Sequence, residues 1–130
     1  MLLSEIALHL ELSGVGVRGT DLFAGEIPAN APPHAIGLLE TGGGAPVFVH
    51  NQNRRIAETP GFQVRVRDPD YEAARQKIEA IAEALTFRDR VLSGVRYHSV
   101  LPTQSPLDLG RDGNEHHLLV CNFDVIKEPS

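Results

Sequence analysis

Residues 62–85, FQVRVRDPDYEAARQKIEAIAEAL, change their hydrophobic period within one continuous run. Apolar and polar side chains alternate up to Arg67, which is the pattern of a β-strand with one buried face. The apolar side chains then recur every three or four positions, which is the pattern of an amphipathic helix. Between them, Asp68-Pro69-Asp70 offers an N-cap and a proline suited to a first helical turn. The run predicts a strand at 61–67 that leads at once into a helix at 69–86.

The same two periods predict the other elements. A short amphipathic helix is expected at 2–12, and two turn-rich loops are expected at 14–33 and 103–116. The further strands are predicted at 34–41, 45–52, 95–102 and 117–126. A chain of 130 residues forms one domain, taken as 1–130. We therefore expect an α+β fold: a mainly antiparallel sheet of about five strands with the long helix packed on one face and a short N-terminal helix.

The charge balance argues against a protein that grips nucleic acid. The formal net charge is −5 and the isoelectric point is near 5.6. Binding to phosphate backbones relies on clustered lysines and arginines, and base stacking relies on aromatic side chains, which make up 5% of this chain. A surface past which DNA merely slides is compatible with this composition.

The cysteine content and the N-terminal residues indicate a soluble intracellular protein. Cys121 is the single cysteine, so no intramolecular disulfide is expected, and its place in an apolar strand pattern predicts a buried, inert thiol. The sequence MLLSEIALHLEL lacks a basic segment and contains Glu5, His9 and Glu11. It therefore resembles neither a signal peptide nor a membrane span.

The sequence contains no motif for enzymatic chemistry in the structural context that the motif requires. GVGVRG at 14–19 has the G-x-G-x-x-G spacing, but a helix precedes it and a proline-rich loop follows, which reverses the dinucleotide-binding arrangement. The histidines lack the short spacing of a zinc site, and His116 and His117 would point to opposite faces of a strand. No serine stands in a G-x-S-x-G turn. No cofactor, metal or catalytic residue is predicted.

The polar face of the strand at 61–67 carries Gln63, Arg65 and Arg67. Three interpretations fit: a solvated surface, a contact between subunits, and a contact with nucleic acid. Arginine suits subunit contacts because its planar guanidinium forms paired hydrogen bonds with carboxylates. The net negative charge ranks nucleic acid last. In the loop at 103–116, Arg111, Asp112 and Glu115 are explained by salt bridges or solvation, or by the same kind of contact.

Several segments in order resemble one known family. They are LFAGEIP before a proline-containing loop, AIGLLETGGGAP, PGFQVRVRDPDYEAA, and LPTQSPLDLGRDGNEHHLLVCNFDV. Together they are similar to the tail terminators of long-tailed bacteriophages and phage-like particles such as gene transfer agents, also labelled minor capsid or tail completion proteins. The resemblance spans nearly the whole chain after the first helix.

The resemblance implies a structural virion protein that is made in the host cytoplasm and is no enzyme. It implies a ring of identical subunits, typically a hexamer, that caps the tail tube and presents its other face to the head connector. DNA would pass through an acidic lumen without specific binding, and no membrane is involved. The expected contact residues are Gln63, Arg65, Arg67, Arg111, Asp112 and Glu115. The loops at 14–33 and 103–116 are further candidates.

Three alternatives remain open at this point. A head–tail neck or connector protein would share many of these features. A small metal-binding enzyme could assemble its site from distant residues and leave no local motif. A cellular regulatory module of the same shape would need neither ring nor tail.

Overall fold

The computed structural model describes every residue except 1, 43–46, 50–53, 112–115 and 130. It contains two helices, α1 (Leu2–Leu12) and α2 (Tyr71–Leu85). The strands are β1 (Leu22–Ala24), β2 (Ala35–Glu40), β3 (Val47–Val49), β4 (Arg54–Ala57), β5 (Gly61–Asp68), β6 (Phe87–Leu92), β7 (Val95–Pro102), β8 (Leu107–Arg111) and β9 (His117–Lys127). The helices predicted at 2–12 and 69–86 are both present, the second with slightly shorter bounds.

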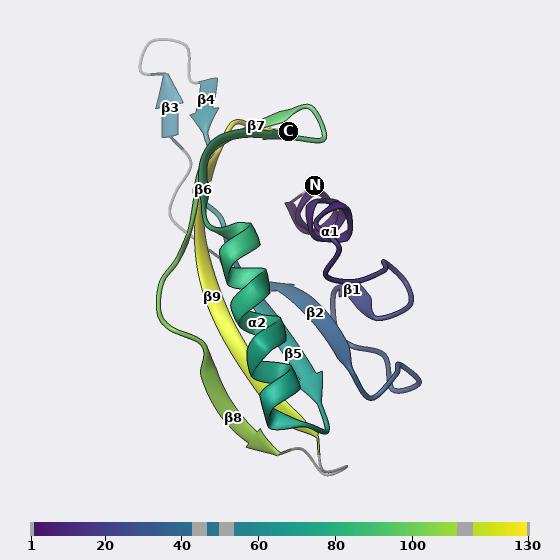
Figure 1. Cartoon of the computed structure of the whole chain (residues 1–130). Coiled ribbons are helices and arrows are strands. Elements are labelled where there is room, and N and C mark those ends of the chain that lie inside the picture. Colours follow the sequence, from purple (N-terminus) through teal and green to yellow (C-terminus); the bar gives the residue numbers. More distant parts are fainter. Residues whose placement is uncertain (1, 43–46, 50–53, 112–115, 130) are drawn as a thin grey trace.

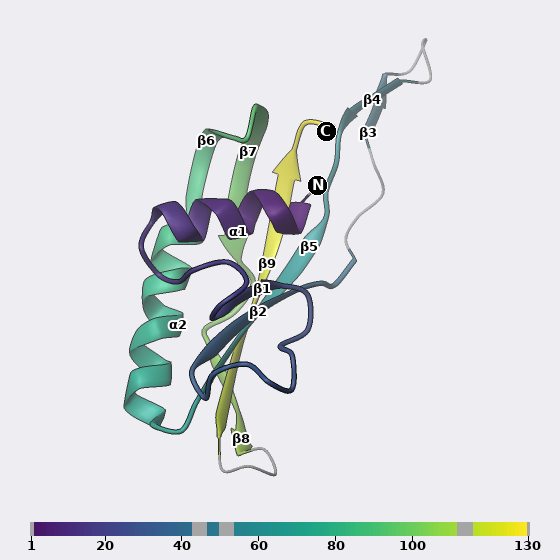
Figure 2. The ribbon, with the colours of Figure 1, turned by 90° about the vertical axis from the view of Figure 1, so that its right-hand side faces the viewer.

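The main sheet has seven strands in the order β1-β2-β5-β9-β7-β6, with β8 also beside β9. Strand β1 runs parallel to β2, and the other described pairs are antiparallel. The sheet curls into a half-barrel, and the hairpin of β3 and β4 forms a second, two-stranded sheet that projects from one end (Figures 1 and 2).

The expected fold class, a mainly antiparallel sheet of about five strands with one long helix on its face, is therefore wrong. The sheet is larger, mixed and curled, and it holds two helices in its hollow (Figure 1). Strands β1, β4, β6 and β8 are missing from the prediction. Strand β6 lacks alternation because four exposed residues separate its buried ends, and β8 is mostly exposed. Pairing with neighbouring strands, rather than burial of one face, defines these two strands.

Strand β9 lies at the centre of the main sheet. One of its edges pairs with the whole of β5, from Gly61 opposite Asp124 to Asp68 opposite His117. Its other edge pairs with β7 near the C-terminal end and with β8 near the start. A central strand bonded on both edges fixes the register of its neighbours, so β9 aligns the outward side chains of β5 with those of β8.

Both helices pack in the concave side of the sheet (Figure 2). Helix α1 buries Ile6 and Leu10, and α2 buries a stripe at helical spacing. The α2 stripe is Ala74, Ile78, Ile81 and Leu85. These side chains join the inward residues of β5 and β9 in one hydrophobic core.

The junction of β5 and α2 follows the predicted change of period. Inward-facing Phe62, Val64 and Val66 are almost fully buried, so the alternate residues of β5 point to the convex side. The N-cap of α2 is Asp70, whose carboxylate accepts a hydrogen bond from the N–H of Glu72 at 3.2 Å. The predicted N-cap, Asp68, lies two residues earlier and accepts a bond from the N–H of Asp70 at 2.9 Å.

A buried charged cluster ties α1 to the sheet. Lys127 is 1% exposed and Glu5 is 6% exposed. The Lys127 ammonium lies 3.5 Å from a carboxylate oxygen of Glu58 and 4.0 Å from Glu5 Oε1, and the Tyr97 hydroxyl donates to the same Glu5 atom at 2.6 Å. Burial, followed by the hydrogen bond to Glu5, raises the pKa of Tyr97 well above its usual range. The cluster holds charge inside the core because its members neutralise one another.

Candidate subunit interface

The predicted polar face of β5 lies on the convex side of the sheet, where its arginines stand among apolar neighbours. The register places Gly37 of β2, Arg65 of β5, Val120 of β9 and Leu107 of β8 in one row across four strands. In a second row, Arg67 lies between Ala35 and Leu118. Of these neighbours Leu107 is exposed, whereas Ala35 and Val120 are buried, and arginine beside an exposed aliphatic side chain is a composition found in protein–protein contacts.

A surface groove of about 320 Å³ follows these rows. We call it the Arg groove, and it is lined by Gly25, Glu26, Ile27, Gly37, Leu39, Arg65, Arg67 and Leu118. The segment after β1 forms one side of it. That segment lies directly on β2, because a Cβ on Gly37 would come within 3.0 Å of Ile27 Cγ1 and 3.1 Å of the Gly25 carbonyl oxygen. Glycine at position 37 therefore permits the close approach that shapes the groove.

Arg67 is held in place by backbone carbonyls. Its Nη2 donates to the carbonyl oxygen of Pro32 at 2.8 Å and, more weakly, to that of Ala31 at 3.4 Å. Its Nε is buried and has no hydrogen-bond partner among the described residues. Two carbonyl contacts orient the guanidinium while its positive charge stays unneutralised, so Arg67 is ready to meet an anionic group.

Arg65 is oriented by a chain of amide side chains. Its Nε donates to Gln63 Oε1 at 2.7 Å, and Gln63 Nε2 donates to Asn122 Oδ1 at 3.0 Å. Asn122 Nδ2 in turn donates to Gln104 Oε1 at 3.4 Å. The chain runs from β5 across β9 to the segment after β7, so Gln63 acts as a positioning residue for the arginine.

Neither arginine has a carboxylate partner in the part of the chain that the structure describes. Glu26 lines the groove without an ion pair to either one. Two oriented guanidinium groups without counter-ions are a candidate site for carboxylates of another chain. Since both arginines are half-buried, pairing there would be screened less by salt than pairing on an open surface.

Strand β8 extends this surface with apolar side chains. Leu107 and Leu109 are 50% and 54% exposed, and Leu107 lies opposite Val120 beside the Arg65 row. Large aliphatic side chains that remain exposed next to oriented arginines make this surface a candidate contact site.

The structure brings together three of the six predicted contact residues, Gln63, Arg65 and Arg67. Arg111 lies at the end of β8 opposite His117, away from the groove lining. Asp112 and Glu115 fall outside the described residues. The prediction missed Ile27, Leu39 and Leu118; the alternation of AIGLLE could have placed Leu39, but nothing local indicates that Ile27 reaches over the sheet.

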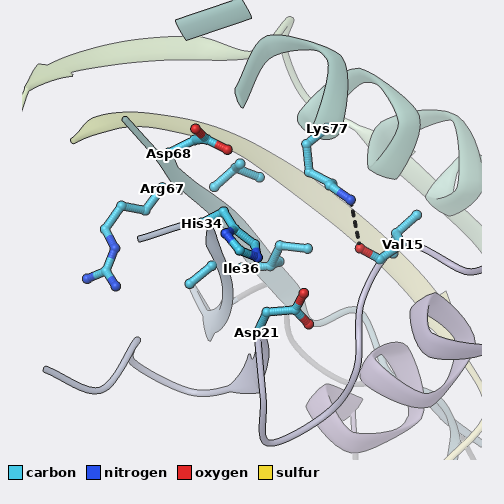
Figure 3. A pocket seen from close by; sticks show the side chains of 9 residues that line it. Val15, Asp21, His34, Ile36, Arg67, Asp68 and Lys77 are labelled. Carbon is cyan, nitrogen blue, oxygen red and sulfur yellow. Dashed lines mark hydrogen bonds between the residues drawn. The ribbon is translucent and has the colours of Figure 1, made fainter. Parts of the chain in front are cut away.

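A second, much smaller cavity lies where α2, β2 and the segment 15–21 meet (Figure 3). It measures about 20 Å³, room for about one water molecule. Asp21, His34 and Asp68 line it, and Lys77 Nζ donates to the carbonyl oxygen of Val15 at 3.0 Å across it. Its size suits a packing junction between the helix and the segment before β1 better than a ligand site.

Metal and thiol chemistry find no support in the described residues. Among the residues that the structure describes, no group of three or more histidine, cysteine, aspartate or glutamate side chains is placed to hold a metal ion. Cys121 is buried, its Sγ donates to the carbonyl oxygen of Gln104 at 3.4 Å, and burial raises the pKa of the thiol. Within the same residues, neither helix is long and apolar enough to cross a membrane.

Comparison with known proteins finds a matching family model and eight matching chains of solved structures. A family model described as "Bacteriophage tail terminator protein" matches residues 9–129. A solved structure, "Virion of native gene transfer agent (GTA) particle", contains a chain that aligns with a TM-score of 0.68 and 16% identity, covering 98% of this chain and 95% of that one. At that identity the alignment shows a shared fold. No curated protein matches the sequence.

Proposed function

We propose that this chain, which belongs to the bacteriophage tail terminator family and is a structural protein of the virion tail, caps the tail tube as a ring of identical copies that contact one another through the Arg groove. In this role it ends tube polymerisation and joins the tail to the head connector.

The observation that carries the proposal is the pair of oriented arginines without counter-ions. Arg65 and Arg67 are held by amide and carbonyl contacts, lie beside exposed leucines, and have no carboxylate partner in the described chain. Such a surface is ready for a protein partner before the partner arrives, which lowers the entropy lost on association. Subunit assembly explains this arrangement better than solvation does.

A ring suits this surface because a closed ring joins one patch on each subunit to a different patch on the next. A hexamer is the ring that membership of the family suggests. Once closed, the ring would bind the tube through one rim and leave the other for the head connector. The segments at 14–33 and 103–116 supply further contact candidates, since part of the first already forms one side of the groove.

The passage of DNA fits the charge of the chain. Each copy carries a formal charge of −5, so a ring of such copies repels the DNA backbone on average. DNA would then slide through without specific binding.

The test reverses the charge of the groove with Arg65→Glu and Arg67→Glu in one chain. We expect a folded monomer that fails to form rings, measured by native mass spectrometry, and particles with irregular tails and unattached heads, counted by electron microscopy. The matched control, Arg88→Glu with Arg90→Glu, makes the same charge change on β6, away from the groove.

Normal rings and normal particles from the groove variant would overturn the proposal. Rings that form normally while heads detach from tails of uniform length would instead favour a neck protein, in which the groove contacts the connector.

A further inference from the structure

The exposed side of α2 carries an acidic stripe. Glu72, Gln76, Glu79 and Glu83 follow one another at spacings of four, three and four residues, so they lie on one side of the helix. All four are exposed, and they lie opposite the buried stripe that begins with Ala74 and ends with Leu85. The stripe therefore points away from the sheet.

The stability of the helix explains Glu72, whose first-turn carboxylate favours the helix dipole, but it does not explain the rest of the stripe. Glu79 and Glu83 are like charges four residues apart, which destabilises a helix slightly. Glu83 also lies in the last turn, where a negative charge opposes the helix dipole and no basic residue compensates it. Glu79 is paired with Arg75 at 3.0 Å, whereas Glu72 and Glu83 have no ion pair in the described chain.

The stripe and the Arg groove lie on opposite sides of the subunit. Helix α2 packs on the concave side of the sheet (Figure 1). The groove is lined by the outward side chains of β5, so it lies on the convex side. Each copy therefore has a basic, partly apolar face and an acidic face directed away from it. Two different, complementary faces are what a head-to-tail contact between identical subunits requires.

We propose that the acidic stripe of one copy binds the Arg groove of the next copy. The inference rests on the proposed ring assembly and names the partner surface. Carboxylates of the stripe accept hydrogen bonds from the guanidinium groups of Arg65 and Arg67. Leu107 and Leu118 of the groove side pack against the aliphatic parts of the glutamate side chains and against Ala80, which is also exposed on the helix.

This pairing is also electrostatically favourable for both surfaces. The arginines gain carboxylates that their own chain does not provide, and the glutamates lose the repulsion that they exert on one another along the helix. A solvated acidic helix face would explain the stripe alone, but it would leave the oriented arginines without a function.

The test uses two charge-reversed variants. The groove variant is Arg65→Glu with Arg67→Glu, and the stripe variant is Glu72→Lys with Glu83→Lys. The two lysines affect the helix dipole in opposite directions, at its first and last turns, so the helix stays intact. Glu40→Lys with Glu128→Lys, at two other exposed glutamates, is the matched control for the stripe variant.

Each variant alone is expected to give monomers by native mass spectrometry and no finished particles in cells that lack the native protein. An equimolar mixture should restore both rings and particles, because reversed grooves accept reversed stripes and native grooves accept native ones. The rings in the mixture should contain the two variants in equal numbers, and the control variant should assemble normally.

The outcomes separate this inference from the proposed function. If the groove variant fails but the stripe variant assembles, the groove binds another surface, so the inference is wrong while the proposed function stands. If both variants fail alone and the mixture does not recover, the two faces do not meet, and the inference is again wrong. If both variants assemble normally, the inference and the proposed function fail together.

Discussion

Single residues in this chain act mainly through the partners that position them. Arg65 and Arg67 are equivalent in the alternating pattern of the strand, yet amide side chains orient the first and two backbone carbonyl groups orient the second. The sequence alone predicted that both would share one strand face. It did not predict the carbonyl contacts, because these come from residues 31 and 32, far away along the chain.

Removing the buried cation should strongly destabilise the fold. In Lys127→Met, the buried carboxylate of Glu5 loses its nearby positive charge, so we expect the free energy of unfolding to fall by about 3–5 kcal/mol. Denaturant unfolding followed by circular dichroism measures this change. Neutralising the more buried carboxylate as well, with Glu5→Gln added, should recover most of the loss. A loss below about 1 kcal/mol in the single variant would show that the cluster contributes little.

Tyr97 should make the stability of the protein depend on alkaline pH. Its folded-state pKa is raised, first by burial and then by the Glu5 carboxylate, so its contribution is fully present below the unfolded tyrosine pKa of about 10 and is lost as the pH rises above it. Between about pH 9 and pH 11, the free energy of unfolding should fall more steeply in the native protein than in Tyr97→Phe. Equal slopes, from denaturant unfolding at each pH, would contradict this.

At the scale of elements, the close approach of β5 to the residues just after β2 depends on a glycine. A Cβ on Gly61 would lie 2.4 Å from the carbonyl oxygen of Gly42 and 2.8 Å from Thr41 Oγ1. The backbone of β5 therefore approaches the end of β2 at a distance that no other residue allows, and the N–H of Thr41 donates to the Gly61 carbonyl oxygen at 3.0 Å.

Gly61→Ala should destabilise the protein by about 1–3 kcal/mol, because the new methyl group forces β2 and β5 apart at this point. Thermal unfolding, followed by circular dichroism, measures the loss. Ala57→Gly, which removes one methyl group from β4, is a comparison for the effect of a methyl group in a strand. An unchanged melting temperature in Gly61→Ala would mean that the strands shift apart freely.

Elements with a strong period were predictable, and those held by pairing alone were not. The strand and helix at 61–86 followed from their alternation and spacing, since each buries one face in the core. Strand β1 has three residues, and β6 places four exposed residues in a row, so neither has a readable pattern. The curl and the parallel edge depend on contacts between distant segments, which no local pattern encodes.

The candidate site was predictable to the same extent. The outward residues of β5 followed from alternation, whereas the groove required the fold, because Ile27 and Leu118 reach it from segments far apart in sequence. The burial of Lys127 could not be predicted either, because a lysine at the end of an apolar strand is usually exposed to solvent.

At the scale of the whole molecule, two opposed charged faces predict an assembly that weakens in salt. The Debye length shortens from about 10 Å at 0.1 M to about 3 Å at 1 M salt, which screens pairs between Arg groove and acidic stripe. Rings should therefore dissociate into folded monomers as sodium chloride rises, as followed by light scattering with circular dichroism as the control for folding. Rings that grow more stable with salt would indicate a mainly apolar contact.

The order of the strands also decides when a newly made copy becomes able to assemble. Strand β9 lies in the middle of the sheet although it is the last strand in the sequence, and it supplies Leu118 to the groove and Asn122 to the chain of amides. Until these residues of β9 have left the ribosome and paired with β5, the Arg groove is incomplete and cannot bind a neighbouring copy. Competence to join a ring is thereby delayed until β9 has been made and has paired with β5, well after β5 and α2 themselves.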